Sequence, residues 1–106
     1  METTTKKRMI FKDATTWPAH TPVIVTVNEG NPQRAHFASV DNPDNVKVIR
    51  SSHLYVWFNG FRKITNEHLE SGAESGICLS LTGEKTEPDG WDSKGFPSML
   101  LACGLI

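Results

Sequence analysis

Residues 46–72 read VKVIRSSHLYVWFNGFRKITNEHLESG, and this stretch decides the fold that the sequence predicts. It holds two strand-like runs, the dipeptide Asn59-Gly60, a third apolar run and a short helical signal. An Asn-Gly pair between aromatic residues is typical of a two-residue type I′ turn, which needs positive φ at both positions. The stretch therefore predicts a β-hairpin made of His53–Phe58 and Phe61–Ile64.

Three further strand signals precede this hairpin, each bounded by Gly, Pro, Asn or Asp residues that favour turns: Val23–Val27, Gln33–Val40 and Val46–Arg50. Because side chains alternate between the two faces of a strand, Arg34 and His36 are expected on the face opposite Phe37. The alternation predicts a sheet with one face in the core and one face carrying basic side chains.

Two helical signals follow the strands. Thr65 is a good N-cap residue with acidic residues after it, so a helical turn is expected over Thr65–Glu70. Pro97 and Gly104 bracket the last apolar run and favour a short helix there. A sixth strand is expected between the helices at Ile77–Leu81.

The chain of 106 residues suits one domain. Residues 1–7 show no apolar period and are expected to form a flexible N-terminus. Residues 8–106 are expected to form a single small β-rich domain, with a barrel-like core at 21–72 and a C-terminal extension at 73–106.

The five short strands, the aromatic hairpin and the helical turn together resemble an SH3-like or Tudor-like barrel. This resemblance implies a mainly β (α+β) fold, with a small antiparallel barrel or sheet of five to six strands and a short C-terminal helix.

The closing residues, DSKGFPSMLLACGLI from Asp92 to Ile106, resemble the ends of small accessory proteins from phages and other mobile elements. That second resemblance implies a host-directed role, such as inhibiting a defence system by binding a host protein or sequestering a signalling nucleotide.

Composition limits the classes of function. No apolar run approaches the roughly 20 residues that span a bilayer, and no apolar segment of a secretory signal follows the basic N-terminus. The two cysteines, Cys78 and Cys103, are too few for a disulfide scaffold, so we expect a reduced, cytoplasmic protein. If the protein is phage-encoded, this compartment is the host cytoplasm. No membrane partner is expected.

Charge is divided unevenly along the chain. Residues 1–63 hold nine Lys or Arg and five Asp or Glu, whereas residues 64–106 hold two and seven. This division fits an anion-binding half beside an acidic half. It fits equally well with halves that neutralise each other within one fold or across a homo-oligomer.

The candidate binding residues come from the predicted hairpin and its neighbouring strands. The hairpin register puts Trp57 opposite Arg62, with Tyr55 on the same face, unless the C-terminal segment covers these aromatic residues. Aromatic residues beside basic ones suit a nucleic-acid base or a partner chain. The predicted ligand- or partner-binding set is Arg34, His36, Arg50, Tyr55, Trp57 and Arg62.

Catalytic and metal signals are weak. The four histidines lack zinc-site spacing, and the acidic loop Glu84–Asp92 lacks calcium-loop spacing. No phosphate loop or nucleophile elbow occurs. We therefore expect no metal and no cofactor. The first hypothesis is a non-catalytic module that binds and inhibits a host protein, followed by a nucleic-acid or nucleotide binder, and then by an enzyme of unknown type.

Overall fold

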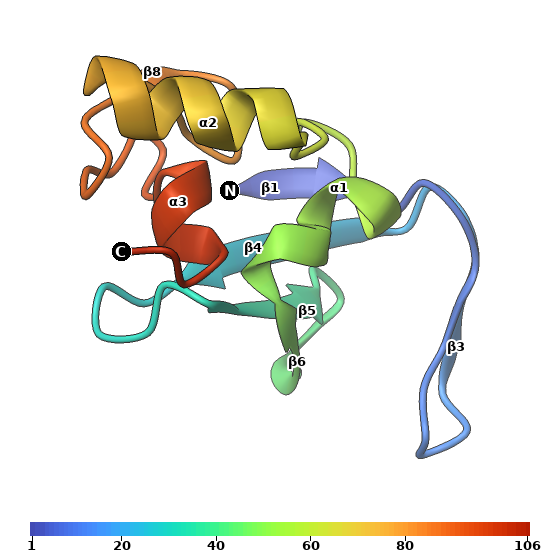
Figure 1. Cartoon of the computed structure of the whole chain (residues 1–106). Helices are drawn as coiled ribbons and strands as arrows, with labels where there is room; N and C mark the ends of the chain where they lie inside the picture. Colours follow the sequence, from blue (N-terminus) through green and yellow to red (C-terminus); the bar gives the residue numbers. More distant parts are fainter.

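A computed structural model describes all residues, 1–106. Its main feature is an antiparallel sheet of four strands in the order β1-β4-β5-β6, formed by Glu2–Thr4, Pro22–Val27, Arg34–Ser39 and Asn42–Arg50 (Figure 1). Two short two-stranded sheets accompany it: β2 (Met9–Ile10) with β3 (Thr16–Trp17), and β7 (Cys78–Leu79) with β8 (Lys85–Thr86). The strands form a small α+β fold and do not close into a barrel. The SH3-like character of its core remains a prediction.

The helices are short and follow the main sheet in the chain. The 3₁₀ turn η1 (Ser51–His53) leads into α1 (Leu54–Trp57), and α2 (Asn66–Ser75) and α3 (Met99–Ala102) follow (Figure 1). None of these helices has the length and apolar composition that crossing a bilayer requires.

The strands β4 and β5 form as their alternation predicts. Val23, Val25 and Val27 point into the core from β4, and every residue between them is exposed. Val25 pairs with the buried Phe37 of β5. The core face of the sheet is thus a layer of β-branched and aromatic side chains, which suits a pleated surface.

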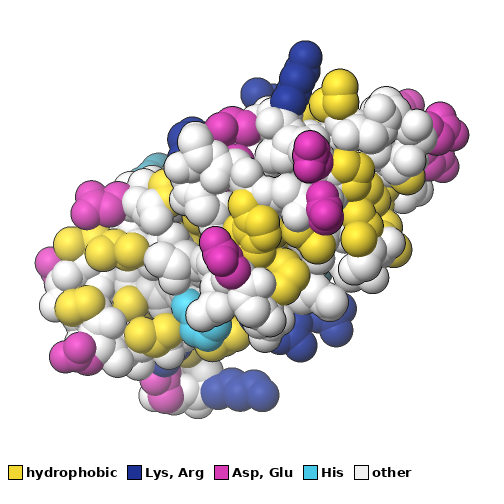
Figure 2. Space-filling model, turned by 90° about the vertical axis from the view of Figure 1, so that its left-hand side faces the viewer, with side chains coloured by type: hydrophobic (Ala, Val, Ile, Leu, Met, Phe, Trp, Pro, Cys, Tyr) yellow, Lys and Arg dark blue, Asp and Glu magenta, His cyan; other side chains and the backbone are white.

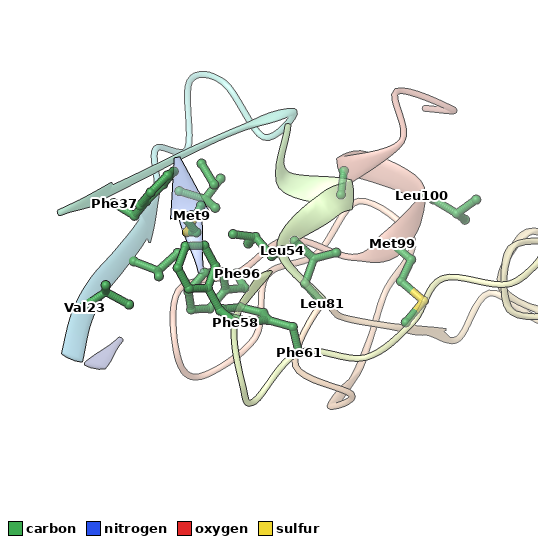
Figure 3. Packing of buried hydrophobic residues seen from close by; sticks show 14 of the residues in the cluster. Met9, Val23, Phe37, Leu54, Phe58, Phe61, Leu81, Phe96, Met99 and Leu100 are labelled. Carbon is green, nitrogen blue, oxygen red and sulfur yellow. The ribbon is translucent and has the colours of Figure 1, made fainter. Parts of the chain in front are cut away.

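Aromatic contacts join the sheet to the rest of the core. The Phe37 ring centroid lies 5.7 Å from that of Trp17 and 5.0 Å from that of Phe58, both in edge-to-face geometry. A second edge-to-face pair, Phe61 and Phe96, has centroids 5.0 Å apart and ties the C-terminal segment to the same cluster (Figure 3). Such pairs stabilise a fold beyond the area that they bury.

The predicted hairpin at Asn59-Gly60 is wrong. Residues 54–57 are helical, and the Phe58 N–H donates to the Leu54 carbonyl oxygen at 2.9 Å. Leu54 and Phe58 are both buried, and residues four apart lie on one face of a helix. Only Gly60 of the dipeptide has positive φ, which excludes a type I′ turn. Residues 61–64, the expected return strand, have no regular structure.

Where the sequence predicted a flexible N-terminus, the structure has the strand β1. Residues 2–4 pair with β4 in register Thr3↔Val23, and the Met1 amine donates to the Val25 carbonyl oxygen at 2.7 Å. The side chain of Asn59 holds the same strand, since its Nδ2 donates to Thr4 Oγ1 at 2.8 Å. The dipeptide expected to turn a hairpin instead anchors β1.

Both helical predictions are confirmed. Thr65 is the N-cap of α2, and its Oγ1 accepts from the His68 N–H at 3.2 Å. The helix runs past the expected stop at Gly72 and ends at Gly76, which has φ of 72°. The C-terminal run forms α3, with Ser98 Oγ accepting from the Leu101 N–H at 3.1 Å.

Candidate functional site

The four-stranded sheet has one face that no other element covers. Its residues, which we call the outer sheet face, come from three neighbouring strands: Ile24 and Thr26 of β4; Arg34, His36 and Ala38 of β5; Val46, Val48 and Arg50 of β6. The register fixes their order, because Arg34 pairs with Arg50 and His36 lies between Thr26 and Val48. The sheet therefore presents three of the six residues that the sequence predicted, namely Arg34, His36 and Arg50, on one surface.

The outer sheet face is apolar at its centre. Val46 and Val48 are 52% and 51% exposed, although β-branched residues of a sheet usually face a core. An open hollow of about 170 Å³ lies beside them, lined among others by Ile24, His36 and Pro43. Exposed apolar side chains that adjoin one another mark interaction surfaces more often than isolated ones do.

The basic end of the face consists of Arg34 and Arg50, which stand directly opposite each other on β5 and β6. Neither guanidinium donates a hydrogen bond or forms an ion pair within the chain, whose only ion pair is Lys47–Asp13. Like charges directly opposite on paired strands destabilise a sheet. Both arginines are consequently free to bind an acceptor from outside the protein.

The opposite face of β6 is covered. A hairpin arm, residues 8–17 with β2 and β3, lies there, and Lys47 Nζ is 2.6 Å from Asp13 Oδ2 and 4.7 Å from the Phe11 ring centroid. The hydrogen bond from Lys47, helped by the Thr15 N–H, lowers the pKa of Asp13 to about 2. This contact fixes the arm to the core side of the sheet and leaves the outer side free.

The remaining predicted residues do not join this face. Trp57 and Tyr55 are half-buried on α1, where Lys7 Nζ lies 4.6 Å from the Trp57 ring centroid and Lys6 Nζ donates to the Tyr55 carbonyl oxygen at 2.5 Å. Arg62 lies against the glycine at position 83, where an added Cβ would be 2.8 Å from its Nε. The predicted pairing of Trp57 with Arg62 depended on the hairpin and is wrong.

No cluster of three or more His, Cys, Asp or Glu residues has the arrangement to hold a metal ion. Cys78 is buried with its Sγ directed to the Leu79 carbonyl oxygen, and burial raises the pKa of the Cys103 thiol. A protonated thiol is a poor nucleophile. His68 has a buried Nδ1 without a partner, but no hydrogen bond links it to either cysteine.

The acidic loop has a structural use. Asp92 accepts hydrogen bonds from Thr82 Oγ1 at 2.6 Å and from the N–H of Phe96 at 2.9 Å. Burial acts to raise the pKa of Asp92, yet these hydrogen bonds hold it below its ordinary value. The carboxylate thus organises the turn that leads into Phe96 and α3.

Sequence reasoning identified the basic residues of the outer sheet face and missed its apolar ones. Ile24, Val46 and Val48 lie in runs of β-branched residues, where only the alternation along the strand separates core positions from exposed ones. Val23–Val27 carried that signal, because Val25 and Ile24 must face opposite ways.

No family of known proteins, no curated protein and no solved structure matches this chain.

Proposed function

We propose that this chain is a non-catalytic binding module that docks on a protein partner through the outer sheet face. The resemblance of its C-terminal residues to phage and mobile-element accessory proteins makes a cytoplasmic host protein the partner class, and inhibition of that protein the proposed effect. The SH3-like character expected of residues 21–72 belongs to the same proposal and rests on the sequence pattern.

One observation carries the proposal: the unpaired Arg34–Arg50 couple borders exposed Val46 and Val48. Protein interfaces are enriched in arginine and apolar at their centres. Arginine also grips carboxylates with two parallel hydrogen bonds. The chemistry therefore favours a partner segment that sets a Glu or Asp side chain on the arginines and an apolar side chain on the hollow beside Ile24.

A nucleic-acid partner is less well supported. Proteins that hold single strands stack bases on aromatic side chains, and the outer sheet face has no Phe, Tyr or Trp. The half-buried Trp57 lies on α1 and is already covered by Lys7. The two arginines alone would give only the salt-sensitive part of nucleic-acid binding.

The test compares what three immobilised proteins retain from an extract of the host cell. These are the wild type, Arg34→Glu with Arg50→Glu, and the control Lys63→Glu with Lys94→Glu, which makes the same change of charge at exposed positions elsewhere. We expect one protein to be retained by the wild type and the control and lost by the arginine variant. Val48→Asp is expected to lose it as well.

Two results would contradict the proposal. Retention of the same proteins by all variants would remove the outer sheet face from consideration. If nuclease treatment abolishes retention of the captured material, and retention falls steeply as salt is raised, the ligand is nucleic acid instead. Thermal melts of every variant precede the capture, so that loss of folding is not counted as loss of binding.

A further inference from the structure

A second apolar surface lies between α2 and the chain end. It is an open groove of about 410 Å³, which we call the acidic groove, lined by Leu69, Glu70, Ala73, Pro88, Leu100, Leu105 and Ile106. Leu105 and Ile106 are 59% and 62% exposed, so the fold itself leaves them uncovered. Figure 2 shows hydrophobic side chains gathered on this side of the molecule with acidic side chains beside them.

Carboxylates border the acidic groove. Glu70 is part of its lining, and Glu67 and Glu74 lie one turn away from it on α2, on the same side of the helix. Pro88 lies between two further exposed acids in the sequence. None of these carboxylates forms an ion pair within the chain. The groove therefore fits a segment that alternates apolar and basic side chains.

The hairpin arm of this same chain is such a segment. Arg8, Ile10 and Lys12 are all exposed and alternate with Met9 and Phe11, which pack on the core. Ile10 is 65% exposed, which makes it one of the least covered apolar residues of the chain. The only acid of the arm, at position 13, is already paired with a lysine of β6. The arm thus shows a basic–apolar–basic row to solvent.

The arm and the acidic groove lie on opposite sides of the molecule. In Figure 1 the arm with β3 descends at the right, whereas α3 and the C-terminus lie at the left. The longest dimension of the molecule is 43 Å. One copy therefore does not bring its own arm to its own groove.

We propose that the arm of one copy binds in the acidic groove of the next copy. Ile10 covers Leu105 and Ile106 of its neighbour, and Arg8 and Lys12 reach the carboxylates of α2, Glu70 first. Because the two surfaces differ, the contact is head-to-tail, and it continues into a ring or a filament. The inference is independent of the proposed function, since neither surface includes the outer sheet face.

The test uses two variants that each lose one surface. Arg8→Gln with Lys12→Gln removes the arm's charge, and Glu70→Gln with Glu74→Gln removes charge from the groove. In sedimentation velocity at about 0.1 M salt, we expect the wild type to associate as its concentration rises. At about 1 M salt we expect it to dissociate, because salt then screens the attraction between the charges. Each variant alone is expected to be monomeric.

Mixing the two variants is the decisive step. The groove variant still has a normal arm, and the arm variant still has a normal groove, so an equal mixture is expected to form a dimer that does not grow further. Lys63→Gln with Lys94→Gln is the matched control and is expected to associate like the wild type. Ile10→Ser, which leaves the charges unchanged, is expected to weaken association at least about tenfold, a change worth about 1.4 kcal/mol.

Three results would overturn the inference. A wild type that stays monomeric at every concentration at about 0.1 M salt has no such contact. A mixture that remains monomeric shows that the two surfaces do not meet. Association that survives both variants and is lost in Arg34→Glu with Arg50→Glu uses the outer sheet face. Circular dichroism of each variant establishes that its fold is intact.

Discussion

Arg34 and Arg50 stand side by side on β5 and β6, and neither has an acceptor within the protein. The core face of this sheet is apolar, with Val23, Val25 and Phe37 buried. On the outer sheet face, by contrast, two positive charges are held together in one cross-strand pair. Positions where a sequence works against its own fold are expected at functional sites.

The first prediction follows from that conflict. Arg50→Thr is expected to raise the free energy of unfolding by about 0.2–1 kcal/mol, because it removes the repulsion and introduces a residue that favours strands. Arg34→Thr is expected to act in the same direction. Urea denaturation of the wild type, both single variants and the double variant gives a double-mutant cycle. In this cycle the second substitution is expected to raise the free energy of unfolding by less than the first, because the repulsion is already gone. A simple sum, or a loss in both single variants, would show that the arginines do not repel each other.

The parts of the fold that the sequence predicted well are those in which local pattern and tertiary surroundings agree. Val23–Val27 and Gln33–Val40 alternate with a period of two, and the structure places them as β4 and β5 with the expected faces inward. Thr65 marked the start of α2 because a hydroxyl that caps a helix depends only on its neighbours in the chain.

The parts that failed depend on distant residues. The run HLYVWF has strong strand propensity, yet Leu54–Trp57 form a helical turn that is fixed by the packing of Leu54 and Phe58 in the core. Residues 2–4 look like a tail, and only β4, some 20 residues later, gives them a partner. The predicted positions of the candidate residues divide for the same reason: Arg34, His36 and Arg50 share a face through strand register, whereas Trp57 and Arg62 depended on a hairpin that does not form.

The second prediction concerns pH. Hydrogen bonding to Lys47 lowers the pKa of Asp13 from 3.8 to about 2 in the folded protein. A carboxylate whose pKa is lowered by folding stabilises the fold fully above its unfolded pKa, and this contribution is lost as pH falls through the folded value. The wild type is therefore expected to melt at a higher temperature than Asp13→Asn near neutral pH. This gap between the two melting temperatures is expected to close as the pH falls from 3.8 to about 2.

A matched control for that experiment is Asp44→Asn, because Asp44 is exposed and forms no ion pair. Its melting temperature is expected to follow that of the wild type across the same pH range. High salt is expected to narrow the gap of Asp13→Asn as well, since exposed charges are screened. A gap that is constant with pH would show that Asp13 acts through its shape and not its charge.

The third prediction concerns the contact between α2 and β7. A Cβ added at Gly72 would lie 2.9 Å from Cys78 Sγ and 3.1 Å from its Cβ. Gly72→Ala is expected to lower the free energy of unfolding, because overpacking costs about 1–3 kcal/mol, more than the gain of up to about 1 kcal/mol in helix propensity. Cys78→Ala removes the nearest atom and is expected to rescue part of the loss. Ser71→Ala, at the adjacent exposed position, is the control.

The last prediction concerns the joint between the N-terminal strand and β4. Thr5 is fully buried, and its Oγ1 donates to the Pro18 carbonyl oxygen and accepts from the Thr21 N–H, both at 2.9 Å. Thr5→Val keeps the shape but leaves the Thr21 N–H without its acceptor, at a cost of about 1–3 kcal/mol, whereas the Pro18 carbonyl oxygen still accepts from Thr21 Oγ1 at 2.6 Å. The free energy of unfolding is expected to fall accordingly, and the Thr21 amide is expected to exchange its hydrogen faster. Thr5→Ser retains both hydrogen bonds and loses only a methyl group, so its loss should stay near the value for one buried methylene, about 0.8 kcal/mol. A larger loss in Thr5→Ser than in Thr5→Val would show that packing, and not hydrogen bonding, holds this joint.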